Sequence, residues 1–384
     1  MPQSKDAIDF VLMRGGTSKG VFLREEDVPQ DRQALTRLLL DLFGSPDRRQ
    51  IDGLGGADKL TSKAAIIGKA RRADSDVTYL FGQVGTVAPE VDFNLNCGNL
   101  TAAVGVYAIE QGLVAPQEGR TLVRVHNLNT DRLVHVRVPM AGGKVQTKGN
   151  FEIGGVPGTG APIELDFSRA VGAITGKLLP FGEPKTRLDV AGVGSIELSV
   201  VDGANLVIYA HAEAFGLTGA EDPQRIDCDA DLKERMDLVR REVAYRLGLA
   251  DYWNARSAPS TPMLVLLQRP RDYLTCTDGT RISAESHDLL CRQYASGSAS
   301  KTLAGTITAT TGIACNLPGS IPAELCGRDA DRPFAFGHPS GLIHVDASVT
   351  WLDRDWHVER AEILRTARRL AEGRAYLRGE HVYD

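Results

Sequence analysis

Cys97 stands at the start of a segment that has the length of a helix and almost no polar side chains. Residues 98–99 are a glycine and an asparagine, residues 100–109 carry no charge, and Gly112 follows at a position typical of a helix end. A helix that is small or apolar on every side belongs in an interior. The N–H groups and the positive dipole end of its first turn would suit an anion. The sequence therefore predicts a protected anion site at the N-terminus of this helix, with the Cys97 thiol beside it. The alternative is that Cys97 is a small packing residue that lets the backbone bind the anion.

A second group of polar residues lies in residues 14–20, directly after a short apolar run that predicts a strand. Arg14, Thr17, Ser18 and Lys19 stand there among three glycines. Such a loop can offer backbone N–H groups, hydroxyls and cations to a carboxylate or a phosphate. Its spacing is not that of a P-loop. The alternative is a glycine turn with incidental charges.

Lys63 begins an apolar, strand-like run after a glycine-dense loop at residues 50–58. Lysines in such places usually extend to water, and a buried, reactive lysine is the alternative. A free lysine has a pKa of about 10.4, so a lysine that acts as a base at neutral pH needs a pKa about 2 to 3 lower. The apolar residues 64–67 make part of that lowering conceivable through desolvation.

The surrounding elements of the first half are a helix and a hairpin. Residues 31–43 place leucines and a phenylalanine on one stripe and end at Gly44, which predicts a surface helix. Residues 121–126 and 133–138 alternate at period two across a polar turn, which predicts a hairpin.

The second half predicts strands near residues 195–201, 205–210 and 263–267, a helix at 229–247 and a short helix around 284–294. Residues 301–316 then form a second small-residue, almost uncharged segment, in which Gly305 and Thr306 stand where Gly98 and Asn99 stand in the first. One such segment in each half indicates two similar α+β units. We expect domains at residues 1–186 and 187–384.

Length and composition agree with two domains of a soluble globular protein. The chain has 384 residues, 42% of them hydrophobic and 24% charged. Its net charge of -5 gives no indication of a surface that binds nucleic acid. No apolar run is long enough to span a bilayer and no secretory signal is evident, so we expect no membrane partner and a cytoplasmic location. The six cysteines have no zinc-type spacing, which predicts free thiols and no metal.

Six motifs together resemble the PrpF family: residues 14–20, 52–57, 61–63, 96–99, 154–158 and 337–341. The resemblance runs from about residue 11 to residue 376. It implies a diaminopimelate-epimerase-like α+β fold, in which two similar domains each wrap a barrel-like sheet around a central helix. It also implies a cofactor-free active site in the cleft between the domains, and a last strand that can cross back to the first domain.

The chemistry that the resemblance implies is isomerisation of a C=C bond in a small unsaturated di- or tricarboxylate, such as methylitaconate, methylaconitate or oxalomesaconate. A base removes an allylic proton, charge spreads as a dienolate onto a carboxylate, and an acid returns a proton elsewhere. The family's catalytic lysine falls on Lys63 and its cysteine on Cys97. We favour Lys63 as a neutral base and Cys97 as a thiol acid. The resemblance further implies substrate-binding groups at Arg14, Gly16, Thr17, Ser18, Lys19, Ser62, Asn96, Gly98, Asn99, Lys301, Gly305, Thr306, His338, Ser340 and Gly341.

Two comparisons within this fold bear on the reaction. Epimerases and racemases of the fold resemble one another in placing a cysteine at the N-terminus of each central helix. Here Cys315 lies at the far end of the second segment, which disfavours a two-cysteine racemase. Many relatives carry His-Lys before the second helix, but this chain has Ser300 and Lys301, which leaves the substrate open. The alternatives are a non-catalytic carboxylate-binding protein and a phenazine-pathway-type isomerase of the same fold. The oligomeric state is open, with a homo-oligomer as one outcome.

Overall fold

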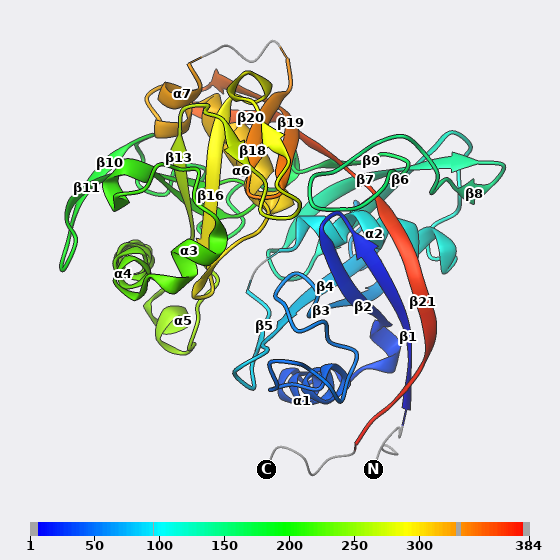
Figure 1. Ribbon diagram of the computed structural model, residues 1–384. Helices are drawn as coiled ribbons and strands as arrows, with labels where there is room; N and C mark the ends of the chain where they lie inside the picture. The colour runs from blue at the N-terminus through cyan, green and yellow to red at the C-terminus, as the bar shows by residue number, and fades with distance from the viewer. Residues whose placement is uncertain (1–6, 95, 328–331, 379–384) are drawn as a thin grey trace. The chain divides into compact units, whose positions relative to one another are not determined.

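The computed structural model describes residues 7–94, 96–327 and 332–378 (Figure 1). The chain divides into two compact units. Unit 1 consists of Met1–Glu152, Gly158–Leu165 and Arg365–Asp384, and unit 2 consists of Ile153–Pro157 and Asp166–Leu364. Both units combine strands with helices, which confirms the expected α+β class.

The division falls about twenty residues before the boundary expected near residue 186. Residues 166–186 belong to unit 2 because they are tied to the end of a unit 2 strand, β11 (Gly194–Asp202). The Asp202 carboxylate accepts hydrogen bonds from the N–H groups of Ile174 and Thr175, at 2.9 and 2.6 Å. A loop that gives its backbone donors to a buried carboxylate is held to that carboxylate's unit.

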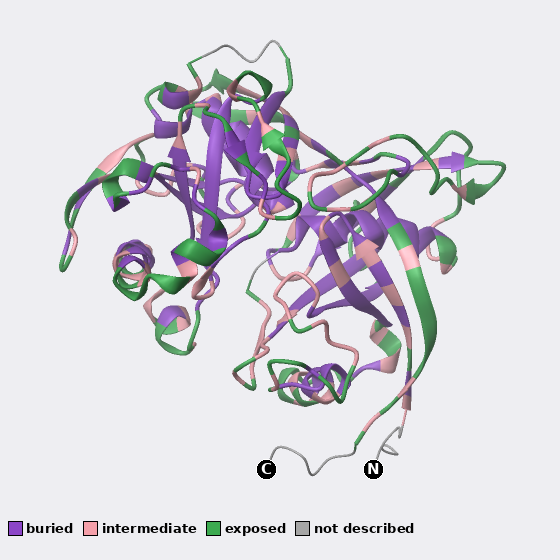
Figure 2. Cartoon of the chain, in the orientation of Figure 1, coloured by how far each residue is buried: buried purple, intermediate pink, exposed green. Residues whose placement is uncertain are grey.

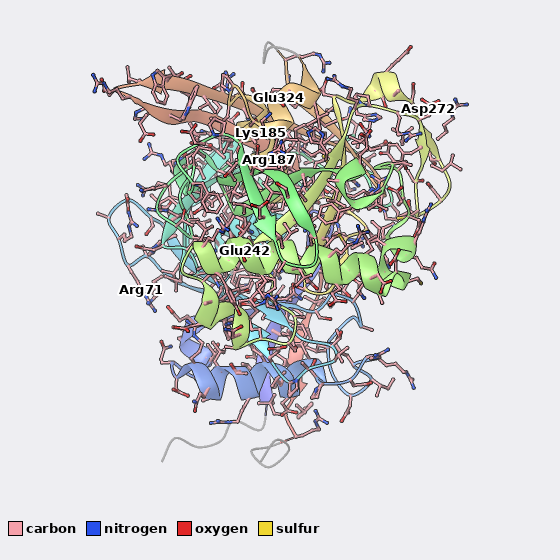
Figure 3. All side chains as sticks on the ribbon, turned by 90° about the vertical axis from the view of Figure 1, so that its left-hand side faces the viewer. Arg71, Lys185, Arg187, Glu242, Asp272 and Glu324 are labelled. Atoms are coloured by element: carbon pink, nitrogen blue, oxygen red, sulfur yellow. The ribbon has the colours of Figure 1, made fainter. Side chains whose placement is uncertain are left out.

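Ion pairs at the end of this loop attach it to unit 2 as well. The Lys185 ammonium lies 2.8 Å from a carboxylate oxygen of Glu324 and 3.4 Å from one of Glu197. Figure 3 labels Lys185 and Glu324 close together above the strands of this unit. The glycine- and proline-rich composition of the loop predicted a boundary, but its contacts decide to which side it belongs.

Unit 1 is a sheet wrapped around one helix. Its strands are β1 (Ala7–Gly15), β2 (Ser18–Arg24), β3 (Lys63–Lys69), β4 (Val77–Val84), β5 (Val91–Asp92), β6 (Arg120–Asn127), β7 (Arg132–Ala141), β8 (Lys144–Val145) and β21 (Ala367–Tyr376), and β9 (Ile163–Asp166) pairs with β7. The last strand, β21, pairs antiparallel with the first, β1, as Figure 1 shows. The final strand of the chain therefore belongs to the sheet of the first unit.

The central helix of unit 1 is α2 (Gly98–Glu110), which confirms the predicted buried helix. Each of residues 98–109 is buried, and the helix contacts β1, β2, β3, β6, β7 and β21. A Cβ at Gly105 would come within 2.6 Å of Val136 and 2.9 Å of Val138, so only glycine allows this approach to β7. The other face of the sheet is covered by α1 (Arg32–Phe43), the predicted surface helix, which ends at Gly44 as predicted and is capped by Asp31.

Unit 2 repeats this plan. Its strands are β10 (Thr186–Val190), β11, β12 (Leu206–His211), β13 (Met263–Gln268), β14 (Tyr273–Leu274), β15 (Arg281–Ile282), β16 (Leu289–Ala295), β17 (Ser298–Ala299), β18 (Phe334–His338), β19 (Gly341–Leu352) and β20 (Asp355–Arg365). Its helices are α3 (Pro223–Cys228), α4 (Ala230–Arg246), α5 (Ala250–Asn254), α6 (Gly305–Cys315) and α7 (Ile321–Cys326). Every residue of α6 is buried, whereas α1 and α4 each show one buried and one exposed side in Figure 2.

The short helix expected around residues 284–294 is wrong. Ala284–Ser286 is one turn of 3-10 helix, and Leu289–Ala295 is strand β16, paired with β13 and β18. All seven residues of β16 are buried, so the strand shows no alternation of apolar and polar positions. A short, fully buried run cannot be assigned to helix or strand by its period.

Candidate functional site

Strand β2 brings Lys63 and Cys97 to one place in unit 1. Its Gly20 pairs in parallel register with Lys63, the first residue of β3. Its Ser18, two residues earlier and hence on the same face of the strand, has its hydroxyl oxygen 3.9 Å from the Cys97 sulfur. A Cβ at Gly20 would meet both the Lys63 carbonyl and the Leu100 side chain of α2, at 2.8 and 2.9 Å. The absent side chain is what lets β2 lie against both elements.

Lys63 points to the face of the sheet that α2 occupies. Its neighbours Ala64 and Ile66 pack in the hydrophobic cluster with α1, so alternation along β3 directs the lysine to the opposite face. The side chain is buried, with only 6% of the residue exposed. Its Nζ donates to Oε1 of Gln83 at 2.7 Å and lies 5.0 Å from the centre of the Phe81 ring. The alternative of a buried lysine, rather than the usual extension to water, is the one that this geometry favours.

Gln83 on β4 holds this lysine in a defined position. Its Nε2 donates to the carbonyls of Lys59 and Ser62, at 3.2 and 3.0 Å. Those two acceptors set the orientation of the amide, so Oε1 faces Lys63. A neutral amine can donate one N–H to this oxygen and still present its lone pair to a substrate. Gln83 was not predicted, because a glutamine within an apolar strand carries no recognisable spacing.

Cys97 is the residue that precedes the first turn of α2, and it is buried with 7% exposed. Its side chain gives α2 no cap, and the thiol instead points to the Ser18 hydroxyl. The Cys97 carbonyl accepts from the N–H and the hydroxyl of Thr101, at 3.1 and 3.0 Å. Because the Cys97 side chain provides no cap, it does not compete with another acceptor for the first-turn N–H groups, including that of Gly98. An anion is such an acceptor.

Asn99, in the same turn, lies between a hydroxyl and a buried cation. Its Nδ2 is 3.1 Å from Oγ1 of Thr17, and its Oδ1 accepts from Nε of Arg365 at 2.9 Å. Arg365 is 2% exposed, and burial lowers its pKa to about 9, which leaves it charged at neutral pH. A Cβ at Gly16, whose φ is +51°, would lie 2.2 Å from the Asn99 oxygen, so this contact requires glycine. Sequence reasoning missed Arg365 as a site residue, because this last residue of β20 lies outside the six motifs.

Other predicted binding residues of unit 1 hold the loops together through the contacts seen here. Arg14 donates to the carbonyls of Gly16 and Thr366, at 3.0 and 2.9 Å. The Ser62 hydroxyl donates to Gln50, and the Asn96 side chain accepts from Asn127. Lys19 is half-buried, and its backbone N–H bonds the Leu60 carbonyl at 2.9 Å.

Unit 2 gathers its predicted residues at the turn between β18 and β19. The Ser340 hydroxyl donates to the carbonyl of Lys301 at 2.6 Å, and the Ser340 N–H donates to Nδ1 of His338 at 3.2 Å. Because Nδ1 accepts, a neutral His338 carries its proton on Nε2. The Gly341 carbonyl accepts from the Tyr273 hydroxyl at 2.7 Å. The Lys301 side chain is exposed.

Gly305 and Thr306 form the first turn of α6, also within unit 2. Ala304 precedes them and provides no side-chain cap. The Thr306 hydroxyl lies 3.4 Å from Nδ2 of Asn205, and the Ala304 N–H donates to Gln293 at 2.9 Å. This turn carries no thiol and no amine.

Among the described residues, no three of the histidines, cysteines, aspartates and glutamates come together as a metal ion would require. The described part of the chain likewise has no helix long and apolar enough to cross a membrane. None of the six cysteines, all of which are described, forms a disulfide.

Known proteins resemble this chain over nearly its whole length. Residues 5–378 match the PrpF protein family. The 3-methylitaconate isomerase of Eubacterium barkeri is 42% identical, covering 96% of this chain and 97% of that one. The 4-oxalomesaconate tautomerase of Pseudomonas putida is 37% identical, covering 95% of each.

Solved structures agree with these relatives. A crystal structure of methylitaconate delta-isomerase superposes with a TM-score of 0.79 at 41% identity, covering 97% of this chain and 96% of that one. A probable proline racemase from Agrobacterium radiobacter K84 superposes with a TM-score of 0.54 at 12% identity, covering 98% and 94%, which bears on the fold alone. The fold is therefore that of the racemase and epimerase class, as expected. The chain belongs to the PrpF family, and it is an isomerase.

Proposed function

We propose that this isomerase moves or isomerises a C=C bond in a small unsaturated di- or tricarboxylate by allylic proton transfer. Lys63 is the base and Cys97 the acid. The observation that carries the proposal is the arrangement at β2, where Ser18 contacts the Cys97 thiol and Gly20 pairs with Lys63. A base and an acid beside the uncapped first turn of a buried helix suit a reaction that creates and then consumes negative charge.

The first step would transfer an allylic C–H proton of the substrate to the Lys63 amine. The electron pair of that bond then spreads through the existing double bond as a dienolate, whose charge rests on a carboxylate. The first-turn N–H groups of α2 and the Thr17 and Ser18 hydroxyls are suitable donors to that carboxylate. This stabilisation matters because it acts on charge that is largest in the intermediate.

The second step would return a proton to another carbon of the dienolate. Cys97 donates its thiol proton there, and the double bond forms at its new place. The resulting ammonium at Lys63 and thiolate at Cys97 then exchange a proton, directly or through solvent, which restores the starting state. The balance is one proton removed and one returned, so the steps use only groups of this chain.

The experiment is proton exchange in D2O, followed by NMR with methylitaconate, methylaconitate and oxalomesaconate in turn. We expect the allylic signal of at least one acid to disappear as its isomer accumulates. The same acids with the Lys63→Ala variant should show neither change. The absence of exchange with all three acids, or full activity of the variant, would contradict the proposal. The acid with the highest kcat/KM would identify the substrate, for which the relatives named above give methylitaconate first place.

A further inference from the structure

We propose that Gln83 is a positioning residue of this isomerase, whose neutral amide oxygen aims the Lys63 amine and leaves it able to give up its proton. The inference rests on the proposed function, in which Lys63 is the base, and deepens it. Gln83 acts through the lysine and not on the substrate. Its contacts lie within unit 1, where the antiparallel pairing of β3 and β4 sets Lys63 directly opposite Gln83.

The orientation of the Gln83 amide follows from what surrounds its nitrogen. Nε2 carries two hydrogens and lies 3.2 and 3.0 Å from the backbone carbonyl oxygens of Lys59 and Ser62. With the amide reversed, its oxygen would face two carbonyl oxygens and be repelled by both. Oε1 is therefore the atom that faces Lys63, 2.7 Å from Nζ.

The backbone before β3 is held to β4 independently of the Gln83 side chain. The Ser62 carbonyl also accepts from the N–H of Val84 at 3.1 Å, and the Ser62 hydroxyl donates to Gln50 at 2.6 Å. A substitution of the Gln83 side chain leaves these two bonds in place. The contact between the amide and the amine can therefore be removed without detaching the loop that leads to Lys63.

The lack of charge on Gln83 matters for a base that must exchange its proton in every turnover. An amide oxygen accepts a hydrogen bond from an amine or from an ammonium, so it can hold Nζ in both protonation states. A carboxylate in the same place would favour the ammonium, because an opposite charge within about 4 to 6 Å favours the charged form. Among the described residues, Lys63 forms no ion pair, and the amide of Gln83 is the acceptor that holds it.

Other titratable groups belong to the elements packed around Lys63. Directly opposite residues of antiparallel strands share a face, and so do every second residue of one strand. The groups that lie on the face of Lys63, or on α2, are Asp92 on β5 opposite Gln83, Tyr79 on β4, Arg24 at the end of β2, Cys97 before α2, and Tyr107 and Glu110 at the end of α2. The test must therefore separate the charge of Lys63 from the charges of these groups.

The test is the pH dependence of kcat and kcat/KM for wild type, Gln83→Glu and Gln83→Met, with whichever of methylitaconate, methylaconitate and oxalomesaconate turns over fastest. The base gains its proton on the acidic limb of this profile. In Gln83→Glu the limb should move to higher pH by about one pH unit or more, because the carboxylate favours the ammonium. In Gln83→Met, whose thioether is a weak acceptor, the limb should move to lower pH by about half a pH unit. There kcat should also fall by about tenfold, because the amine is no longer aimed.

A merely structural role of Gln83 would lower kcat in both variants and leave the acidic limb where wild type has it, and that result would overturn the inference. If Gln83→Glu does not fold, the direction of the limb in Gln83→Met decides. The matched control is Gln293→Glu in unit 2, where Nε2 lies 3.6 Å from the Met263 sulfur instead of an amine. Whatever its effect on the rate, this variant should leave the limb in place. An equal movement of the limb in Gln293→Glu and Gln83→Glu would also overturn the inference.

NMR of the protein labelled with 13C at the lysine Cε atoms reads the charge of Lys63 without turnover. Its resonance is the one that is absent from Lys63→Arg, and its titration midpoint should rise in Gln83→Glu. A resonance that titrates alike in wild type and Gln83→Glu would overturn the inference and leave the proposed function standing. A midpoint that moves, when wild type exchanges no allylic proton with any of the three acids, would contradict the proposed function and leave the action of Gln83 on the amine standing.

Discussion

The two central helices, α2 in unit 1 and α6 in unit 2, have the same pattern of small residues. They differ in the residue that precedes the first turn, which is Cys97 for α2 and Ala304 for α6. Each begins with a glycine, has a threonine three residues later and a second glycine seven residues later. Both threonines bond back to the carbonyl of the residue before the helix at 3.0 Å. Gly312 approaches β19 as Gly105 approaches β7, since a Cβ at Gly312 would lie 2.8 Å from Val345. The repeated plan, faint in the sequence, is clear in the packing.

The difference lies in the reactive groups. Met263 begins β13 in parallel register with Val207, as Lys63 begins β3 in register with Gly20. Leu264 and Leu266 pack on the side of α4, so Met263 faces α6. A thioether therefore stands in unit 2 where an amine stands in unit 1, and an alanine precedes α6 where a cysteine precedes α2.

The glutamines on the neighbouring strands follow the same division. Gln83 gives its oxygen to Lys63, whereas Gln293 places its nitrogen 3.6 Å from the Met263 sulfur and gives its oxygen to the N–H of Ala304. The scaffold is therefore duplicated, whereas among the described residues a lysine and a cysteine stand beside the first turn of α2 and a methionine and an alanine stand beside that of α6.

Lys63→Met, which copies unit 2 into unit 1, should have the largest effect. It removes the proposed base, and we expect kcat/KM to fall by about 10³-fold or more. The matched control, Met263→Leu, should stay within about twofold of wild type. Comparable losses of kcat/KM in both variants would mean that the regions beside α2 and α6 both take part in the chemistry.

Cys97→Ala, which copies Ala304, should come next. Loss of the proposed proton donor should lower kcat by about 10²-fold, with a smaller change in KM because the helix turn remains. Cys315→Ala, at the other end of α6, is the cysteine control and should keep its activity. Steady-state kinetics of both variants measures these effects. A Cys97→Ala variant with normal kcat would show that the thiol has only a packing role.

Gly105→Ala and Gly312→Ala test the shared scaffold. Each added methyl would enter a filled space against a valine, and overpacking of this kind costs about 1–3 kcal/mol, offset by about 1 kcal/mol of helix propensity. We expect each to destabilise by up to about 2 kcal/mol, and by similar amounts, in urea denaturation. A large loss at one glycine and none at the other would break the structural parallel.

Two tyrosines give the smallest expected effects. The Tyr79 hydroxyl is buried without a hydrogen-bond partner among the described residues, whereas the Tyr209 hydroxyl lies 3.1 Å from Oγ1 of Thr311 on α6. Tyr79→Phe should therefore be neutral or slightly stabilising, and Tyr209→Phe should cost about 1 kcal/mol. Thermal unfolding of the two variants measures this, and a destabilised Tyr79→Phe would indicate that this hydroxyl has a partner after all.

Local patterns in the sequence determined much of the fold. The stripe and caps at residues 31–43, the alternation of the β6–β7 hairpin and the uncharged runs of α2 and α6 each predict one element, because their periods and end residues are local properties. The family motifs identified Lys63 and Cys97 as candidates, and the matching proteins confirm the family, the fold and the isomerase class.

Only the tertiary structure decided the rest, because the deciding contacts join residues distant in sequence. Residues 289–295 became a strand through pairing with β13 and β18, not through any period of their own. The loop at 166–186 belongs to unit 2 because Asp202 binds it. Arg365 reaches Asn99 across 266 positions, a contact that no local pattern could predict.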